Sequence, residues 1–176
     1  MNPLTENCLL PELEVRLLSI GGRVFYLNDS LKEWRQTEEY MNQTLHLLGC
    51  GQEFDGASAV MVPGDSRLCH ANTAALYFIS HGQLEMWTGW GLNDLGGWTE
   101  HTWGRYKNKI YDSAGKWCRY FGFKIAQQEK CAVIELNRIG RLRDDPRDYI
   151  ESCFGSEDSD LLTTIFNETA PLEGWG

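Results

Sequence analysis

The sequence predicts an α+β fold in which helices flank a central set of antiparallel strands. Apolar residues recur at helical spacing near the N-terminus, whereas the middle of the chain holds short segments, rich in tryptophan and tyrosine, between turn residues. Helices grouped around a run of strands are typical of this fold class. At 176 residues the chain has the length of one domain. We expect a mainly helical part over 1–56, a core over 57–137 and C-terminal helices over 138–176.

The N-terminal part is expected to contain two helices with a short strand between them. Apolar spacing predicts the first helix over Leu9–Ile20, where two glycines end it. Arg23–Leu27 is the expected strand. Asp29 or Ser30 then serves as the N-cap of a longer helix that ends near Gly49.

The next segment leads into a buried helix. Gln52–Gly56 is expected to be a loop and Ala57–Val62 a short strand. Asp65 or Ser66 follows a turn and is the expected N-cap of a helix that continues to about Ser80.

Strand signals dominate the rest of the core. Lys107-Asn108 reads as a tight hairpin turn between two of the strands. The expected strands are 84–92, 98–106, 109–113, 119–125 and 131–137, and two helices are expected near 146–153 and 159–166.

The overall charge argues against a nucleic-acid partner. A net charge of −9 would repel a phosphate backbone. No apolar stretch approaches the roughly 20 residues that span a bilayer, and the N-terminus lacks the cationic start of a secretion signal. We therefore expect a cytoplasmic protein that binds neither nucleic acid nor membrane, with its scattered cysteines reduced. The sequence does not indicate an oligomeric state.

Cys69 is the leading candidate for a catalytic residue. It opens the run Cys69-His70-Ala71-Asn72, which reads as the first turn of the buried helix. The partial positive charge at a helix N-terminus favours a thiolate over a thiol. Amides of this turn can also stabilise an oxyanion, and Gln52 is a further candidate for that role. The alternative is that Cys69 is a small core residue, as buried cysteines often are.

His101 and Asp112 follow in the order that a thiol enzyme requires. An imidazole activates the thiol and a carboxylate holds the imidazole in the correct tautomer. Both residues lie in predicted neighbouring strands, and the hairpin register decides whether they meet. His101 can instead be a strand histidine and Asp112 a strand-end cap. The alternative partners for His101 are Asn108, Asp94 and Glu100.

Asn72 lies one helical turn beyond Cys69, on the same face of the helix. In that position its amide can hold the strand that carries His101 through hydrogen bonds to the backbone. The alternative is an exposed polar residue without a role in the site.

Four short motifs between Leu68 and Ala114 resemble those of small papain-like and transglutaminase-like thiol enzymes. The motifs are Cys69-His70-Ala71-Asn72, Gly89-Trp90-Gly91, Glu100-His101-Thr102-Trp103 and Tyr111-Asp112. The resemblance covers about a quarter of the chain. It implies a helix packed on an antiparallel sheet, with Cys69 as nucleophile, His101 as base and Asp112 as orienter.

The resemblance also implies the chemistry. Such enzymes act on an amide carbonyl of a protein or peptide as peptidases, deamidases or transglutaminases, and they need no cofactor. Asn72, Gln52, Trp90 and Trp103 are the expected supporting or substrate-contacting residues. A chain that kept these residues without activity is the alternative within the same family.

Two other classes of protein compete with this prediction. A zinc site would draw on Cys69, His70, His81, His101 and Cys118, but no Cys-x-x-Cys or His-x₃-His pair occurs, and adjacent residues such as Cys69 and His70 are expected on different helix faces. We therefore expect no metal. A non-catalytic module that binds a protein or peptide is the stronger competitor, because five tryptophans between residues 87 and 117 would form a platform if exposed on one sheet face.

Overall fold

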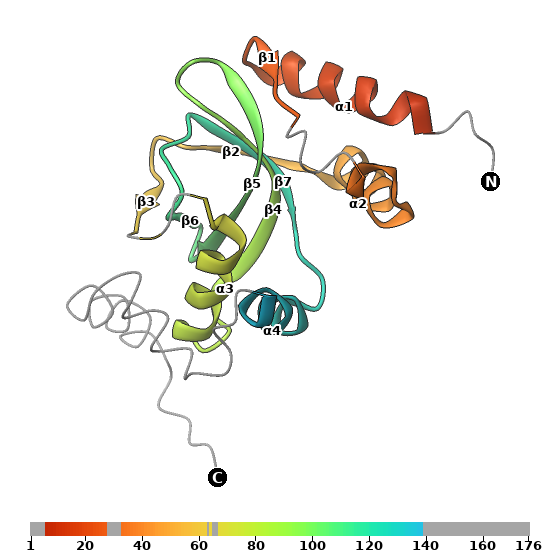
Figure 1. The fold of residues 1–176 in the computed structure, drawn as a ribbon. Helices are drawn as coiled ribbons and strands as arrows, with labels where there is room; N and C mark the ends of the chain where they lie inside the picture. Colours follow the sequence, from red (N-terminus) through yellow and green to blue (C-terminus); the bar gives the residue numbers. More distant parts are fainter. Residues whose placement is uncertain (1–5, 28–32, 63, 65–66, 139–176) are drawn as a thin grey trace. The chain divides into compact units, whose positions relative to one another are not determined.

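The computed structural model describes residues 6–27, 33–62, 64 and 67–138, which are drawn in colour in Figure 1. These residues group into two compact units. Unit 1 comprises the described residues of 1–59, 87–102 and 116–124, and unit 2 those of 60–86, 103–115 and 125–138. The strands hydrogen-bond in the order β2-β7-β4-β5-β6-β3, with β1 beside β5. Together with the helices, this sheet makes the fold α+β, as the sequence predicts, but the sheet is mixed and not purely antiparallel as expected, because β1 and β3 each pair parallel with a neighbouring strand. No helix over the described residues is long and apolar enough to cross a bilayer.

Unit 1 packs two helices around strand segments. Its elements are α1 (Glu6–Ile20), β1 (Val24–Phe25), η2 (Trp34–Gln36), α2 (Glu38–Cys50), β2 (Gln52–Asp55), β7 (Arg119–Lys124) and the parts of β4 (Glu85–Leu92) and β5 (Gly97–Tyr106) that it contains. Both β2 and β4 pair antiparallel with β7, while β1 runs parallel to β5. The buried side chains of its core are Leu13, Leu17, Leu47, Trp90, Leu92, Trp98 and Phe121.

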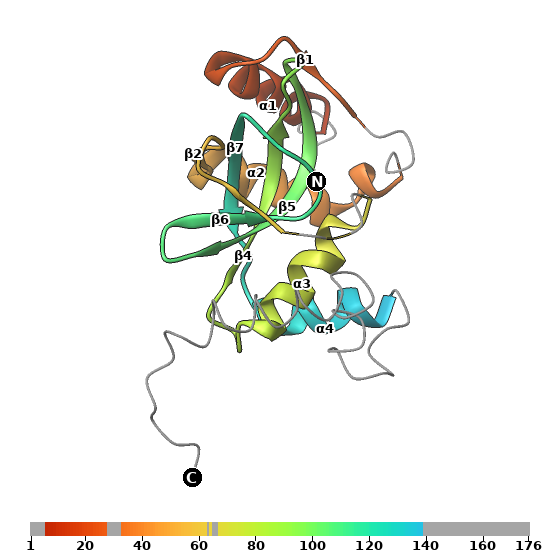
Figure 2. The ribbon, with the colours of Figure 1, turned by 90° about the vertical axis from the view of Figure 1, so that its left-hand side faces the viewer.

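Unit 2 has a core of its own. Its elements are β3 (Val60–Met61), α3 (Cys69–Ile79), β6 (Lys109–Asp112), α4 (Gln128–Arg138) and the remaining parts of β4 and β5. β6 pairs antiparallel with β5 and parallel with β3. Helices α3 and α4 lie side by side in both ribbon views (Figures 1 and 2). Twelve buried residues, among them Ala71, Leu76 and Leu136, form this second core.

The structure confirms the predicted positions of the four central strands, each of which begins and ends within one residue of its predicted bounds. β4, β5, β6 and β7 occupy the segments predicted at 84–92, 98–106, 109–113 and 119–125. Lys107 and Asn108 both have positive φ, 46° and 64°. Positive φ at both residues is required in the two-residue hairpin turn whose twist matches that of the flanking strands. Alternating apolar residues and turn residues are local signals, so these strands can be recognised without knowledge of the fold.

The predicted strand over 131–137 is wrong, because this segment belongs to helix α4. Ala132 and Leu136 are fully buried and lie four residues apart, so they occupy one helix face. They join the core to which α3 contributes. The β-branched pair Val133-Ile134 favours a strand locally, but packing of the Ala132–Leu136 face outweighs that preference.

The long second helix is also not as predicted. The structure breaks it at Thr37, which separates the 3₁₀ turn η2 from α2. Thr37 is the N-cap of α2, and its Oγ1 accepts a hydrogen bond of 3.2 Å from the amide of Tyr40. The predicted caps Asp29 and Ser30 lie outside the described residues.

Gln52–Gly56 is not the predicted loop, because Gln52–Asp55 forms β2. Four residues of β2 pair with β7, from Gln52 opposite Gly122 to Asp55 opposite Arg119. Hydrogen bonding to a neighbouring strand, rather than any local pattern, makes this segment a strand. The expected C-terminal helices, near 146–153 and 159–166, lie outside the described residues.

Candidate functional site

Cys69 is the first residue of α3, which confirms its predicted place in the first helical turn. Its N-cap is Leu68, not Asp65 or Ser66, which lie outside the described residues. The Leu68 side chain accepts no hydrogen bond from the turn, and the first helical bond runs from the Asn72 amide to the Leu68 carbonyl over 2.9 Å. The thiol of Cys69, which is partly exposed, therefore lies at the positive end of a helix whose N-cap supplies no side-chain acceptor.

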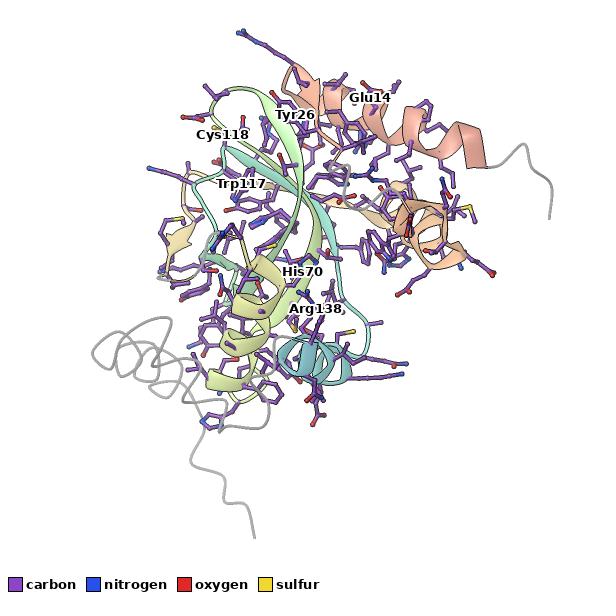
Figure 3. The ribbon with its side chains drawn as sticks, in the orientation of Figure 1. Glu14, Tyr26, His70, Trp117, Cys118 and Arg138 are labelled. Carbon is purple, nitrogen blue, oxygen red and sulfur yellow. The ribbon has the colours of Figure 1, made fainter. Side chains whose placement is uncertain are left out.

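His70 lies closer to the thiol than the sequence suggests. Its Nδ1 is 3.4 Å from the Sγ of Cys69, although adjacent helical residues are expected on different faces. His70 is exposed on the first turn of α3 and is labelled in Figure 3. The expectation that the two side chains point apart is thus wrong, because at the first helical residue there is no preceding turn to direct the side chain. Cys69 has an imidazole in contact from its own helix.

Asn72 is completely buried, which excludes the alternative of an exposed polar residue. A Cβ on Gly64 would lie 2.8 Å from Asn72 Nδ2 and 2.7 Å from the Cβ of Ser113. Only glycine fits at position 64 between these two side chains. The structure therefore places Asn72 near Ser113, the residue that follows Asp112 at the end of β6.

Asp112 is buried at the end of β6, with 1% of its surface exposed. Its Oδ1 accepts a hydrogen bond of 2.9 Å from the amide of Ala114, and its carbonyl accepts one of 2.8 Å from Val62. The strand-end role considered for Asp112 is therefore present. The β5–β6 register ends with Gly104 opposite Tyr111, and the strand partner of Asp112 is Met61 of β3.

His101 belongs to unit 1 and is held among aromatic rings. Its imidazole centroid lies 4.7 Å from the Trp117 ring, tilted by 37°, and 6.2 Å from the Tyr120 ring, tilted by 32°. Trp117 lies on the segment that leads into β7 (Figure 3). Its indole Nε1 is buried and donates no hydrogen bond to any described residue. Because only 3% of His101 is exposed, these contacts restrict the orientation of its ring.

Trp117 packs on the candidate base His101, a contact that the sequence analysis does not predict, although it includes this residue in the tryptophan platform. A Cβ on Gly91 would lie 2.6 Å from a carbon of the Trp117 ring, so the glycine of the Gly89-Trp90-Gly91 motif provides the room for this indole. The motif itself was the signal, because a strand glycine often marks a close approach. Nothing in the sequence identifies Trp117 as the residue that fills that space.

The alternative partners proposed for His101 are occupied or exposed. Glu100 accepts a hydrogen bond of 3.2 Å from the hydroxyl of Tyr40, and its Oε1 lies 3.8 Å from Nε of Arg35. Asn108 and Asp94 are exposed, the first in the hairpin turn and the second in the loop between β4 and β5. Among these three, only Glu100 is partly buried, and its carboxylate already has two partners.

Gln52 and Trp90, the remaining predicted supporting residues of unit 1, lie in different environments. Gln52 is exposed at the first position of β2. Trp90 is buried in the unit 1 core, where its ring stacks on Phe25 at 4.5 Å. Their roles in catalysis remain predictions.

The tryptophan platform is not exposed. Trp87, Trp90, Trp98 and Trp103 have at most 4% of their surface accessible, and Trp117 is partly buried. These rings therefore contribute to buried packing and do not form an open binding face.

Cys69, Asn72, Asp112 and Trp103 thus belong to unit 2, whereas His101, Gln52 and Trp90 belong to unit 1. The pairing of Cys69 with His101 stays a prediction. Among the residues that the structure describes, no three His, Cys, Asp or Glu side chains are grouped as metal ligands. Comparisons with protein-family models, with curated proteins and with solved structures found no match to this chain.

Proposed function

We propose that the protein is a thiol-dependent enzyme that cleaves or transfers an acyl group at an amide carbonyl of a protein or peptide. The observation that carries the proposal is the position of Cys69. Its partly exposed thiol is on the first residue of α3, behind an N-cap without a side-chain acceptor. Helix N-termini are a common setting for activated cysteines. A reducing, cytoplasmic location is part of this proposal, since the nucleophile must stay a thiol.

In the proposed mechanism Cys69 supplies the nucleophile and His101 the base. The thiolate adds to the carbonyl carbon while the thiol proton is held on the imidazole, and amides of the first turn of α3 stabilise the oxyanion. The C–N bond then breaks, and the leaving amine takes the proton from His101. Water, or a second amine, attacks the resulting thioester and releases Cys69.

Asp112 and Asn72 have supporting roles in this mechanism. Asp112 would orient the imidazole with a carboxylate whose position is set by the Ala114 amide. Asn72 would connect the start of α3 with the end of β6, where the structure places its buried amide near Ser113. Trp117 would hold the imidazole ring through the contact at 4.7 Å.

The proposal is tested by alkylating the cysteines with iodoacetamide between about pH 5 and 9 and locating the adducts by peptide mass spectrometry. At about pH 6.5, far below the ordinary cysteine pKa of about 8.5, we expect Cys69 to react about tenfold faster than Cys131. His101→Ala should remove this difference. A matched His70→Ala variant tests the imidazole that lies 3.4 Å from the thiol.

Three results would count against the proposal as stated. Labelling of Cys69 no faster than that of Cys131 would remove the activated nucleophile. Loss of fast labelling in His70→Ala but not in His101→Ala would assign the base to His70. Failure of the fast-labelling wild-type protein to form a covalent acyl adduct with peptide thioesters, read by intact mass, or formation of that adduct by Cys69→Ala, would remove the acyl-transfer step.

A further inference from the structure

A second thiol–imidazole contact lies in unit 1, at the C-terminal end of α2. His46 and Cys50 are four residues apart, so their side chains share one helix face. The Sγ of Cys50 lies 3.2 Å from Nε2 of His46 and 3.0 Å from the His46 carbonyl oxygen. Both residues are exposed. The pair is therefore accessible to an ion from solution.

The spacing of the two atoms fits a shared metal ion. Zinc binds thiolate at about 2.3 Å and imidazole at about 2.0–2.1 Å, which at a tetrahedral angle separates the sulfur and nitrogen by about 3.6 Å. The observed 3.2 Å corresponds to an S–Zn–N angle of about 95° with the same bond lengths. Opening the contact by about 0.4 Å reaches the ideal value, and side-chain torsions alone can supply that.

The helix end favours a cation at this position. Cys50 is the last residue of α2, where the carbonyl groups of the final turn carry partial negative charge. The last turn contains no basic side chain. A bound cation would therefore interact favourably with the helix end, and the thiolate that it requires would have its charge offset by the metal.

His46 is held in place on its other side. Its ring packs edge-on against Phe123 at 4.6 Å, with an angle of 87° between the planes. His46 and Phe123 also line an open groove of about 500 Å³, together with Glu38, Glu39, Asn42 and Gln43. The groove leaves room for water in the remaining coordination positions, and its two glutamates attract cations.

We propose that His46 and Cys50 form a binding site for a soft divalent cation of the zinc class. Cys50 loses its thiol proton to solvent and binds through Sγ, His46 binds through Nε2, and water completes the coordination shell. Soft thiolate with imidazole selects zinc-like ions over magnesium or calcium. With two protein ligands the site is exchangeable, unlike structural zinc sites, which are closed by four ligands.

The test uses cobalt(II) as a spectroscopic probe on the reduced, full-length protein. Wild-type protein should develop a thiolate-to-cobalt charge-transfer band that saturates at one ion per chain. Cys50→Ser should abolish that band, and His46→Gln should weaken cobalt binding at least tenfold. Cys69→Ser is the matched control, because its thiol also contacts an imidazole, and it should keep the full band. The cobalt measurement therefore tests the metal site at His46 and Cys50 separately from the proposed enzyme, which depends on Cys69.

Zinc calorimetry on the same variants provides the second measurement. Removing both ligands should cost no more affinity than removing the more important one, because the two act as a single chelate. A charge-transfer band that persists in Cys50→Ser would overturn the proposal. So would unchanged affinity in His46→Gln, or wild-type binding no tighter than millimolar, which would leave only a thiol–imidazole hydrogen bond.

Discussion

Among the residues that the structure describes, Cys50 and Cys69 each contact an imidazole, and the two contacts arise in different ways. Cys50 meets His46 one helical turn away, a spacing that can be recognised in any helical sequence. Cys69 meets the adjacent His70 because it is the first residue of its helix. The second contact introduces a competitor for the role assigned to His101. The comparison of His70→Ala with His101→Ala therefore decides which imidazole acts on Cys69.

Tyr40 couples ionisation to stability in unit 1. Burial, followed by the nearby Glu100 carboxylate, raises the pKa of its phenol above the ordinary value. The folded protein therefore holds the phenolic proton more tightly than the unfolded chain, in which tyrosine ionises near pH 10. The resulting stabilisation is fully present below about pH 10 and is lost as the pH rises above it.

Tyr40→Phe should therefore flatten the alkaline loss of stability. Between about pH 9.5 and 11 the free energy of unfolding of the variant should fall less steeply than that of the wild type, by up to about 1.4 kcal/mol per pH unit. Urea denaturation at several pH values measures this slope. Tyr111, whose pKa burial also raises, keeps part of the slope in the variant. Tyr26→Phe, at a half-exposed side chain, is the control, and an identical slope in Tyr40→Phe would contradict the assignment.

Within the helices and strands, local packing decides whether a glycine can be replaced by a residue with a Cβ. Gly49 lies within α2, and a Cβ there would meet nothing within 4 Å. Gly91 lies in β4, and a Cβ there would meet the Trp117 ring at 2.6 Å. The first glycine weakens its helix without a packing reason, whereas the second is required by the indole.

Alanine substitutions at these two positions should have opposite effects. Gly49→Ala should raise the free energy of unfolding by up to about 1 kcal/mol through helix propensity. Gly91→Ala should lower it by about 1–3 kcal/mol through overpacking, and should displace Trp117. Urea midpoints followed by tryptophan fluorescence give both values. Equal effects at the two sites would show that Trp117 does not pack on Gly91.

Helix α4 and strand β2 show where local sequence patterns fail to predict secondary structure. The predicted strand at 131–137 became a helix because Ala132 and Leu136 bury one face, and the predicted loop at 52–56 became a strand because β7 pairs with it. Both segments have weak or conflicting local preferences. Their conformation depends on partners that are distant in sequence, which a local pattern cannot contain.

Across the whole molecule, the described residues form two separate buried clusters. Leu17 is completely buried in the cluster of unit 1 and Leu76 in that of unit 2. Strands β4 and β5 each contribute residues to both units. The units are thus linked through continuous strands, although each has an apolar core of its own.

Truncating each core should affect its own unit first. Leu17→Ala and Leu76→Ala should each cost about 2–5 kcal/mol. Hydrogen exchange should show earlier loss of protection in β7 for Leu17→Ala and in α4 for Leu76→Ala. Val15→Ala, on the exposed side of α1, should change stability by less than about 0.5 kcal/mol. Equal loss in both elements for either core variant would mean that the two clusters unfold as one.

The sequence by itself determined the fold class, the four central strands and the place of Cys69 at the start of a helix. These features depend on alternation, turn residues and helical spacing, which act between near neighbours in the chain. Only the tertiary structure decided that Asn72 is buried beside Ser113, that Trp117 covers Gly91 and packs on His101, and that four tryptophans, Trp87, Trp90, Trp98 and Trp103, are core residues. Such contacts join segments that lie far apart in sequence, so their energies exist only once the chain has folded.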